Sequence, residues 1–212
     1  MGRVSRDQAD RHRQQIVEAA SHVFRERGAA SVSIGDVMRE VGLTNGGFYR
    51  HFPSKDALVA EAAANAYEQM NAGLTGLEET SVDHRAALAE LVRGYLSEHN
   101  RDDWAGGCVT TGFGSDVARS DDRAVRTAFA QGVQDFAAWL SDEGDAVTPA
   151  ALVRMSTMVG ALFLARATST TDFSADVLGA ARSHLLRELG EAGPEGAGPG
   201  GTGLEGAGSP AA

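Results

Sequence analysis

The chain has 212 residues, a formal net charge of −10 and one cysteine. This length supports one or two domains, each with a core of its own. One cysteine excludes a disulfide framework within the chain, and Cys108 has no partners at zinc-ligand spacing, so we expect no metal. The longest apolar run, residues 155–165, is shorter than the roughly 18 residues of a membrane span, and we expect a cytoplasmic protein with no membrane partner.

The charge is distributed unevenly along the chain. Residues 1–55 contain nine basic and six acidic side chains, a net charge of +3, which leaves −13 for the remainder. A basic head on an acidic body is typical of a protein in which one small domain contacts nucleic acid. Lys55 is the only lysine among 19 cationic residues.

The N-terminal part begins with a polar stretch, residues 1–10, which we expect to be a flexible arm. An alternative is that Arg3 and Arg6 reach a minor groove of DNA. Residues 11–27 have the apolar spacing of a helix, which Gly28 ends. The apolar positions of this helix are Ile16, Ala20, Val23 and Phe24.

Two short helices around a tight turn follow. Residues 33–41 start with Ser33 as the N-cap and Asp36 completing a capping-box pattern, and Gly42 ends them. Leu43 is the buried residue of the turn. In this first helix the apolar face consists of Ile34, Val37, Met38 and Val41.

The second short helix is predicted over residues 44–52, with Thr44 as its N-cap and with Phe48 and Phe52 facing inward. Its other face is polar and has little bulk near its N-terminus, as a DNA-recognition helix requires. That face consists of Asn45, Gly46, Gly47, Tyr49, Arg50 and His51.

The next helix begins after Pro53, with Ser54 as its N-cap, and is predicted to end near residue 76. Lys55 therefore lies at a helix N-terminus, where its ammonium group and the free backbone N–H groups together suit a phosphate. The alternative is an ordinary solvated lysine.

The stretch LTNGGFYRHFPSKDAL, preceded by SVSIGDVMREVG, resembles the signature of the TetR/AcrR family of bacterial repressors. The resemblance spans about residues 12–62. It implies that Thr44, Asn45 and the two glycines face the bases. It also implies that the phosphate contacts come from Ser33, Tyr49, His51 and Lys55.

The pair Gly46 and Gly47 departs from the family pattern, because each glycine costs roughly 1 kcal/mol inside a helix. Either the helix is marginal in the absence of DNA, or the missing side chains let the backbone approach the groove. The operator sequence cannot be read from these residues.

Helical patterns continue through the remainder of the chain, which predicts an all-α fold. An N-terminal three-helix helix-turn-helix domain, residues 11–53, precedes an α-helical ligand-binding and dimerisation domain, residues 54–190, and residues 54–76 connect the two. Residues 191–212 contain eight glycines and three prolines and are expected to be a disordered tail. The later helices are predicted at residues 83–100, 115–119, 122–143, 148–167 and 172–190, with a glycine-rich break at 101–114.

The last two helices are candidates for a homodimer interface, because residues 152–165 are apolar nearly all round. The alternative is a helix sandwiched inside one chain. The resemblance favours the dimer, in which two recognition helices would read half-sites about 34–36 Å apart. The candidate interface residues are Leu152, Met155, Val159, Phe163, Val177, Ala181, Leu185 and Leu189.

By resemblance, the middle helices enclose a cavity for a small-molecule effector. Aromatic and methionine side chains would suit an apolar or aromatic ligand, although core packing explains them equally well. The candidates are Trp104, Phe113, Phe136, Trp139, Met155 and Met158.

Two competing functions were considered beside a repressor that binds a palindromic double-stranded DNA operator. One is an enzyme in which Cys108 is a nucleophile and His84 or His99 its base. The sequence lacks the motifs that would complete such a site, and a packed thiol is the simpler interpretation, so we expect neither an enzyme nor a cofactor. The other is a constitutive or architectural DNA-binding protein without an effector.

Overall fold

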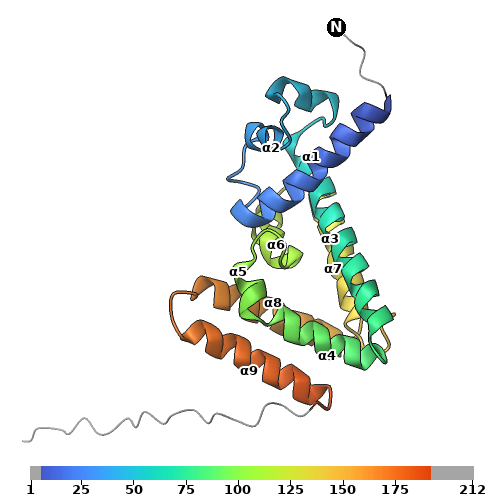
Figure 1. Cartoon of the computed structure of the whole chain (residues 1–212), viewed down its shortest axis with the longest axis vertical. Helices are drawn as coiled ribbons and strands as arrows, with labels where there is room; N and C mark the ends of the chain where they lie inside the picture. Colours follow the sequence, from blue (N-terminus) through green and yellow to red (C-terminus); the bar gives the residue numbers. More distant parts are fainter. Residues whose placement is uncertain (1–5, 192–212) are drawn as a thin grey trace, which may run out of the picture.

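The computed structural model describes residues 6–191, and within this range the chain is helical with no strand. Figure 1 shows an open frame, with the N-terminal helices at one end and α4, α8 and α9 at the other. In chain order the helices are α1 (Arg6–Arg27), α2 (Ile34–Glu40), the 3₁₀ helix η1 (Asn45–Arg50), α3 (Lys55–Thr80), α4 (His84–Tyr95), α5 (Glu98–Asp102), α6 (Val109–Arg119), α7 (Arg123–Trp139), α8 (Pro149–Ala167) and α9 (Phe173–Glu188).

Two hydrophobic cores hold the frame together. One joins α1, α2 and η1 to the first half of α3 and to α6, with Phe24, Phe48 and Phe113 fully buried. The other joins α4, α8 and α9 to the distal parts of α3 and α7. Because α6 contributes to the first core, the N-terminal bundle packs directly on the larger domain.

The helices α3 and α7 lie side by side and connect the two ends of the frame (Figure 1). A glycine makes their close contact possible. A Cβ atom on Gly132 would lie 2.1 Å from Cδ2 of Tyr67, which no side chain could tolerate. The hydroxyl group of Tyr67 lies 3.1 Å from Oγ1 of Thr110 on α6, so the same tyrosine links three helices.

The structure confirms side-chain caps at three of the four predicted positions, Ser33, Ser54 and Thr148, and shows none at Thr44. Ser33 and Asp36 form the complete capping box of α2. The hydroxyl group of Ser54 accepts a hydrogen bond from Ala57 N at the start of α3, and that of Thr148 accepts one from Ala151 N at the start of α8. Short polar side chains next to free N–H groups define these ends locally, which is why the sequence alone locates them.

Helix α1 begins at Arg6, five residues before the predicted start, so residues 6–10 are helical and do not belong to a flexible arm. Arg3 lies outside the described residues, and so do residues 192–212 of the predicted tail. Helix α3 extends to Thr80, beyond the predicted end, and α7 ends at Trp139, before it.

The segment between α4 and α6 differs most from the prediction. Helix α4 ends at Tyr95, because Ser97 donates its hydroxyl hydrogen to Gly94 O and accepts one from Asn100 N, which ends one helix and caps α5. The predicted break at residues 101–114 shortens to 103–108, since α6 already begins at Val109. Gly112 belongs to α6 and allows close packing, because a Cβ atom there would lie 2.8 Å from Cγ of Arg25.

By length and composition α8 could cross a membrane, with a mean hydropathy of 1.4. It packs against α9, however, and 44% of the apolar stretch is buried inside the protein. One face of α8 therefore packs inside the chain, while Leu152, Val153, Phe163 and Leu164 remain exposed.

Candidate nucleic-acid interface and ligand cleft

The predicted recognition segment forms the 3₁₀ helix η1 instead of the expected α-helix. Its hydrogen bonds span three residues, as from Gly47 N to Thr44 O at 2.9 Å and from His51 N to Phe48 O at 2.8 Å. The rings of Phe48 and Phe52 stack in the core with centroids 5.5 Å apart. Two adjacent glycines and a length of six residues disfavour an α-helix, and the aromatic anchors fix the orientation of the segment.

The outward face of η1 is exposed, although the Tyr49 ring lies edge-on to Phe48 with centroids 5.2 Å apart. Thr44, Asn45, Tyr49 and Arg50 are exposed, and Tyr49 has 69% of its surface accessible. The side chain of Thr44 makes no cap hydrogen bond. The polar donors of η1, anchored by the buried Phe48 and Phe52, therefore face solvent.

Two glycines in this segment have different surroundings. A Cβ atom on Gly46 would meet open space, whereas one on Gly47 would lie 3.7 Å from Cε of Met38. Neither contact requires glycine, so the packing within the chain gives no reason for the pair. A close approach of the η1 backbone to a DNA groove, one of the two readings of the sequence, is compatible with this geometry.

Ser33 was predicted to contact phosphate, but its hydroxyl hydrogen is already donated to Asp36 Oδ2 at 2.6 Å. This bond, a second one from Ser33 N and the nearby Arg39 hold the pKa of Asp36 at about 2. The Asp36 carboxylate is thus ionised at neutral pH. A phosphate contact by the Ser33 hydroxyl would have to compete with the cap.

His51 and Lys55 follow the exposed face. His51 is half-buried, and burial together with the charges of His12, Arg13 and Arg50 lowers its pKa, so its ring is neutral at pH 7 and can donate from a single nitrogen. Lys55 is the first residue of α3 and lies half-buried at the predicted helix N-terminus.

One link between this domain and the larger domain was not predicted. Asp116 on α6 accepts hydrogen bonds from Ala29 N and Ala30 N in the loop after α1. The partners are 87 and 86 residues apart, and nothing local in the sequence indicates the pair. Asp116 therefore ties α6 to the loop that leads to α2.

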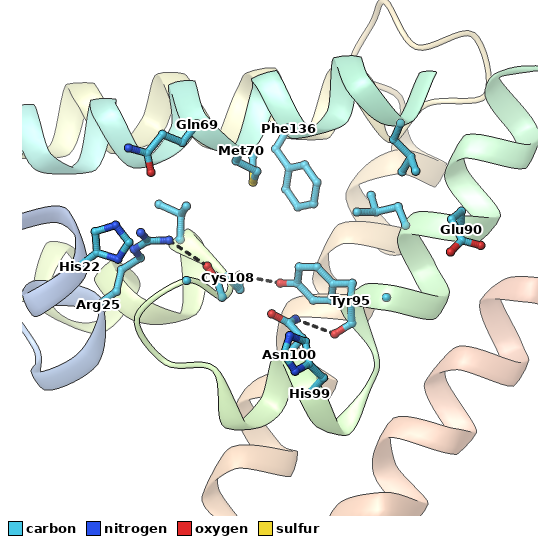
Figure 2. A pocket seen from close by; sticks show the side chains of 16 residues that line it. His22, Arg25, Gln69, Met70, Glu90, Tyr95, His99, Asn100, Cys108 and Phe136 are labelled. Carbon is cyan, nitrogen blue, oxygen red and sulfur yellow. Dashed lines mark hydrogen bonds between the residues drawn. The ribbon is translucent and has the colours of Figure 1, made fainter. Parts of the chain in front are cut away.

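A cleft of about 670 Å³ lies between α1, α3, α4 and the loop before α6, within the usual size range of small-molecule sites. Figure 2 shows His22, Arg25 and Gln69 at one end and Glu90 at the other, with Met70 and Phe136 on the wall between them. Among the six pocket candidates, Phe136 lines this cleft.

The other five candidates lie elsewhere. Phe113 and Met158 are fully buried in the two cores, and Met155 is 9% exposed. Trp139 packs against His84, with ring centroids 5.1 Å apart. Trp104 is 45% exposed and lies over the guanidinium group of Arg166.

Cys108 lines the cleft and is the N-cap of α6. Its sulfur accepts hydrogen bonds from Tyr95 Oη at 2.7 Å and Thr111 N at 3.3 Å. Burial raises the pKa of Tyr95 well above its usual value, so the phenol stays protonated and donates. Within residues 6–191 no hydrogen bond connects Cys108 to His84 or His99, the bases considered for an enzyme.

Large apolar side chains are exposed on α8 and at the start of α9. They are Leu152, Val153, Phe163, Leu164 and Phe173.

Three residues of the predicted interface are buried within a single chain and cannot contact a partner. Leu185 is 0%, Leu189 4% and Met155 9% exposed. Leu152 and Phe163 are exposed as predicted, whereas Val159, Val177 and Ala181 are half-buried. The periodicity located the apolar helices correctly but could not indicate which apolar face packs inside the chain.

Comparison with known proteins agrees with this geometry. Residues 16–62 match the family model described as bacterial regulatory proteins, tetR family. The transcriptional regulator TtgR of Pseudomonas putida is 36% identical over 90 residues, which are 42% of this chain and 37% of the relative. The chain spans less than half of the length of the curated relatives that it matches.

Solved structures resemble nearly the whole chain. A TetR-family regulator from Agrobacterium tumefaciens superposes with a TM-score of 0.71 at 23% identity, covering 85% of this chain and 98% of that one. A putative transcriptional regulator from Saccharomonospora viridis, solved in complex with choline, has a TM-score of 0.62 at 22% identity, with coverages of 85% and 96%. At these identities the likeness establishes the fold.

Proposed function

Because the chain belongs to the TetR family of transcriptional regulators, we propose that it is a cytoplasmic repressor that binds a palindromic operator as a homodimer and leaves it when a small-molecule effector binds. One observation carries the proposal. The exposed polar face of η1 lies on the buried Phe48 and Phe52 inside the segment that matches the family model. Donors on this face suit base edges and phosphates.

The outer surface of α8 and α9 supports the homodimer. Five large apolar side chains, among them Phe163 and Phe173, are exposed there, and pairing two copies would remove them from water. Two-fold symmetry would then place two copies of η1 on one face of the duplex. The resulting half-sites would be centred about 34–36 Å apart or slightly further.

The cleft between α1, α3 and α4 supports the effector. Its volume of about 670 Å³ suits a small molecule, and a structural neighbour of the same fold holds choline. The cleft also touches the DNA-binding domain, because His22 and Arg25 belong to α1. A ligand that moves these side chains can alter the position of α1 and of the helices packed on it.

The enzyme alternative receives no support. The relative and the neighbours reported above are transcriptional regulators, in agreement with the prediction that the chain is not an enzyme. The sulfur of Cys108 is engaged by Tyr95 and Thr111, so packing and helix capping account for this residue.

Selection from random duplexes tests the proposed function. The full chain should enrich one sequence containing an inverted repeat, with two protomers bound per site. The variant Tyr49→Ala, altered at an exposed position of η1, should bind the enriched sequence more weakly while it unfolds at the same temperature as the wild type. Failure to enrich any sequence, or one protomer per site, contradicts the proposal. An operator that no small molecule releases, with no ligand stabilising the fold, would favour the constitutive binder.

A further inference from the structure

Arg25 is a buried cation in the wall of the cleft. It is 5% exposed, and burial lowers its pKa from the usual value. Its Nε donates to Ser21 O at 3.0 Å and its Nη1 to Gly107 O at 3.2 Å. Within the described part of the chain, no carboxylate forms an ion pair with Arg25 and its Nη2 has no hydrogen-bond partner.

This buried guanidinium group is energetically costly, because it has lost water and gained two carbonyl acceptors and the nearby charge of Asp103, with which it forms no ion pair. The side chain is not free to leave. Its stem lies against the backbone of α6, where a Cβ atom on Gly112 would lie 2.8 Å from Cγ of Arg25. The fold thus fixes an incompletely paired cation at the wall of the cleft.

The groups near Arg25 are polar, and apolar side chains follow further along the wall of the cleft. Figure 2 shows His22 and Gln69 beside Arg25, all three at the end formed by α1 and α3. Met70 and Phe136 lie further along the cleft, and Leu77 and Leu91 also line it. The cleft therefore combines a cationic end with an apolar channel.

A cationic ligand would find a weaker counter-charge in this cleft than an anionic one. Glu90 is the carboxylate among the residues that line the cleft. Its side chain is 61% exposed and lies 3.6 Å from Nη1 of Arg93, so water and a neighbouring cation already screen its charge. A cationic ligand would also approach the unpaired Arg25.

From the guanidinium group of Arg25, which has no ion pair and lies at one end of a cleft with an apolar wall, we infer that the effector is an amphipathic carboxylate, with its head on Nη2 of Arg25 and its apolar body along Met70, Leu91 and Phe136. This rests on the proposed effector role of the cleft. A carboxylate matches the planar donors of a guanidinium group and relieves its incomplete pairing.

The position of Arg25 also gives the ligand a route to the DNA-binding domain. Arg25 lies in the last turn of α1, one residue after Phe24, which is fully buried in the N-terminal core. The hydrogen bond to Gly107 O connects α1 to the loop before α6. Because the stem of Arg25 is held against α6, an anion bound to Nη2 would act on this connection and through it on the placement of α1.

Three probes with the same chain separate charge from apolar fit: decanoate, decanol and decyltrimethylammonium, each below its micellar concentration. Their affinities for the full-length protein are measured by isothermal titration calorimetry. Decanoate should bind about tenfold or more tightly than decanol, because a hydrogen-bonded pair between charged groups adds to the common apolar contacts. Decyltrimethylammonium should bind most weakly.

The variant Arg25→Gln should remove the preference for decanoate and leave the affinity for decanol within about threefold, which also checks that the cleft is intact. Arg25→Lys keeps the charge and should retain part of the preference. Arg27→Gln is the matched control on the same helix, since Arg27 is exposed, pairs with Glu26 and does not line the cleft. This control should behave as the wild type.

Equal affinities for the three probes, or tightest binding of the ammonium, would overturn the inference while leaving the cleft as an effector site. Absence of binding by all three would overturn it too. Operator binding by the same unliganded preparation is measured separately, so a failure of the proposed DNA-binding function is recognised independently of the ligand result.

Discussion

Arg166 offers a direct test of how the larger domain is held together. It is 5% exposed and donates four hydrogen bonds, to Arg101 O, Thr111 Oγ1, Asn100 O and Asp103 O, at 2.8–3.0 Å. Three of these acceptors are carbonyl groups at the end of α5, which a helix leaves without partners of its own. The guanidinium group also lies 4.6 Å from the ring centroid of Trp104.

The substitution Arg166→Met keeps an unbranched apolar stem and removes every donor. Each buried acceptor left unpaired costs roughly 1–3 kcal/mol, and the lost cation–π contact adds about 0.5–1 kcal/mol. Because the carbonyl groups lie on half-buried residues, water replaces some of these bonds. We therefore expect the free energy of unfolding to fall by about 3 kcal/mol, a large part of the roughly 5–15 kcal/mol of a typical domain.

Urea unfolding followed by circular dichroism measures this loss. Arg11→Met is the control, since Arg11 is exposed and its side chain has no hydrogen bond or ion pair within residues 6–191, and it should change stability by about 0.5 kcal/mol or less. If Arg166→Met also stays within about 1 kcal/mol of the wild type, the guanidinium group does not hold the α5–α6 segment and our reasoning is wrong.

Three further predictions follow from burial and protonation. Phe163→Asp, on the exposed surface of α8, should give folded monomers in analytical ultracentrifugation, whereas Leu185→Asp should unfold the chain because Leu185 is 0% exposed; a dimeric Phe163→Asp protein would contradict the interface. The pKa of Asp36 falls from 3.8 to about 2 in the folded state, so its contribution to stability is complete above pH 3.8 and is lost as the pH falls toward 2. Asp36→Asn should flatten the dependence of stability on pH in that window, and an unchanged dependence would refute the role of Asp36 in the cap. Cys108→Ser should keep operator binding within a few fold in a filter-binding assay, since serine also caps α6, and complete loss would point to a sensing thiol.

Local features of the fold could be predicted from the sequence. The caps at Ser33, Ser54 and Thr148 depend on hydrogen bonds to backbone groups three residues away, and the apolar spacing of η1 identified Phe48 and Phe52 as core residues. A sequence shows such interactions because both partners are close in the chain.

Interactions between distant residues could not be predicted. The bonds of Arg25 to Gly107 and of Asp116 to Ala29 span 82 and 87 residues, and no periodic pattern marks either pair. Pocket candidates chosen for size and polarisability turned out to fill cores, as Phe113 and Met158 do, because large apolar side chains pack densely. The cleft is lined instead by residues of mixed type. They come from helices that are distant in the sequence and meet only in the folded chain.

The salt dependence of operator binding tests the central claim most directly, because it separates phosphate contacts from base contacts. Lys55→Ala should weaken binding to operator and random duplex alike, by roughly 1–2 kcal/mol, and reduce the salt slope by about one counterion per subunit. Asn45→Ala should keep the slope and lose roughly 1–3 kcal/mol on the operator alone, since an amide can pair with one base. The reverse result, with Asn45 carrying the salt dependence and Lys55 the base preference, would contradict the assignment of Asn45 to the bases and of Lys55 to the phosphates.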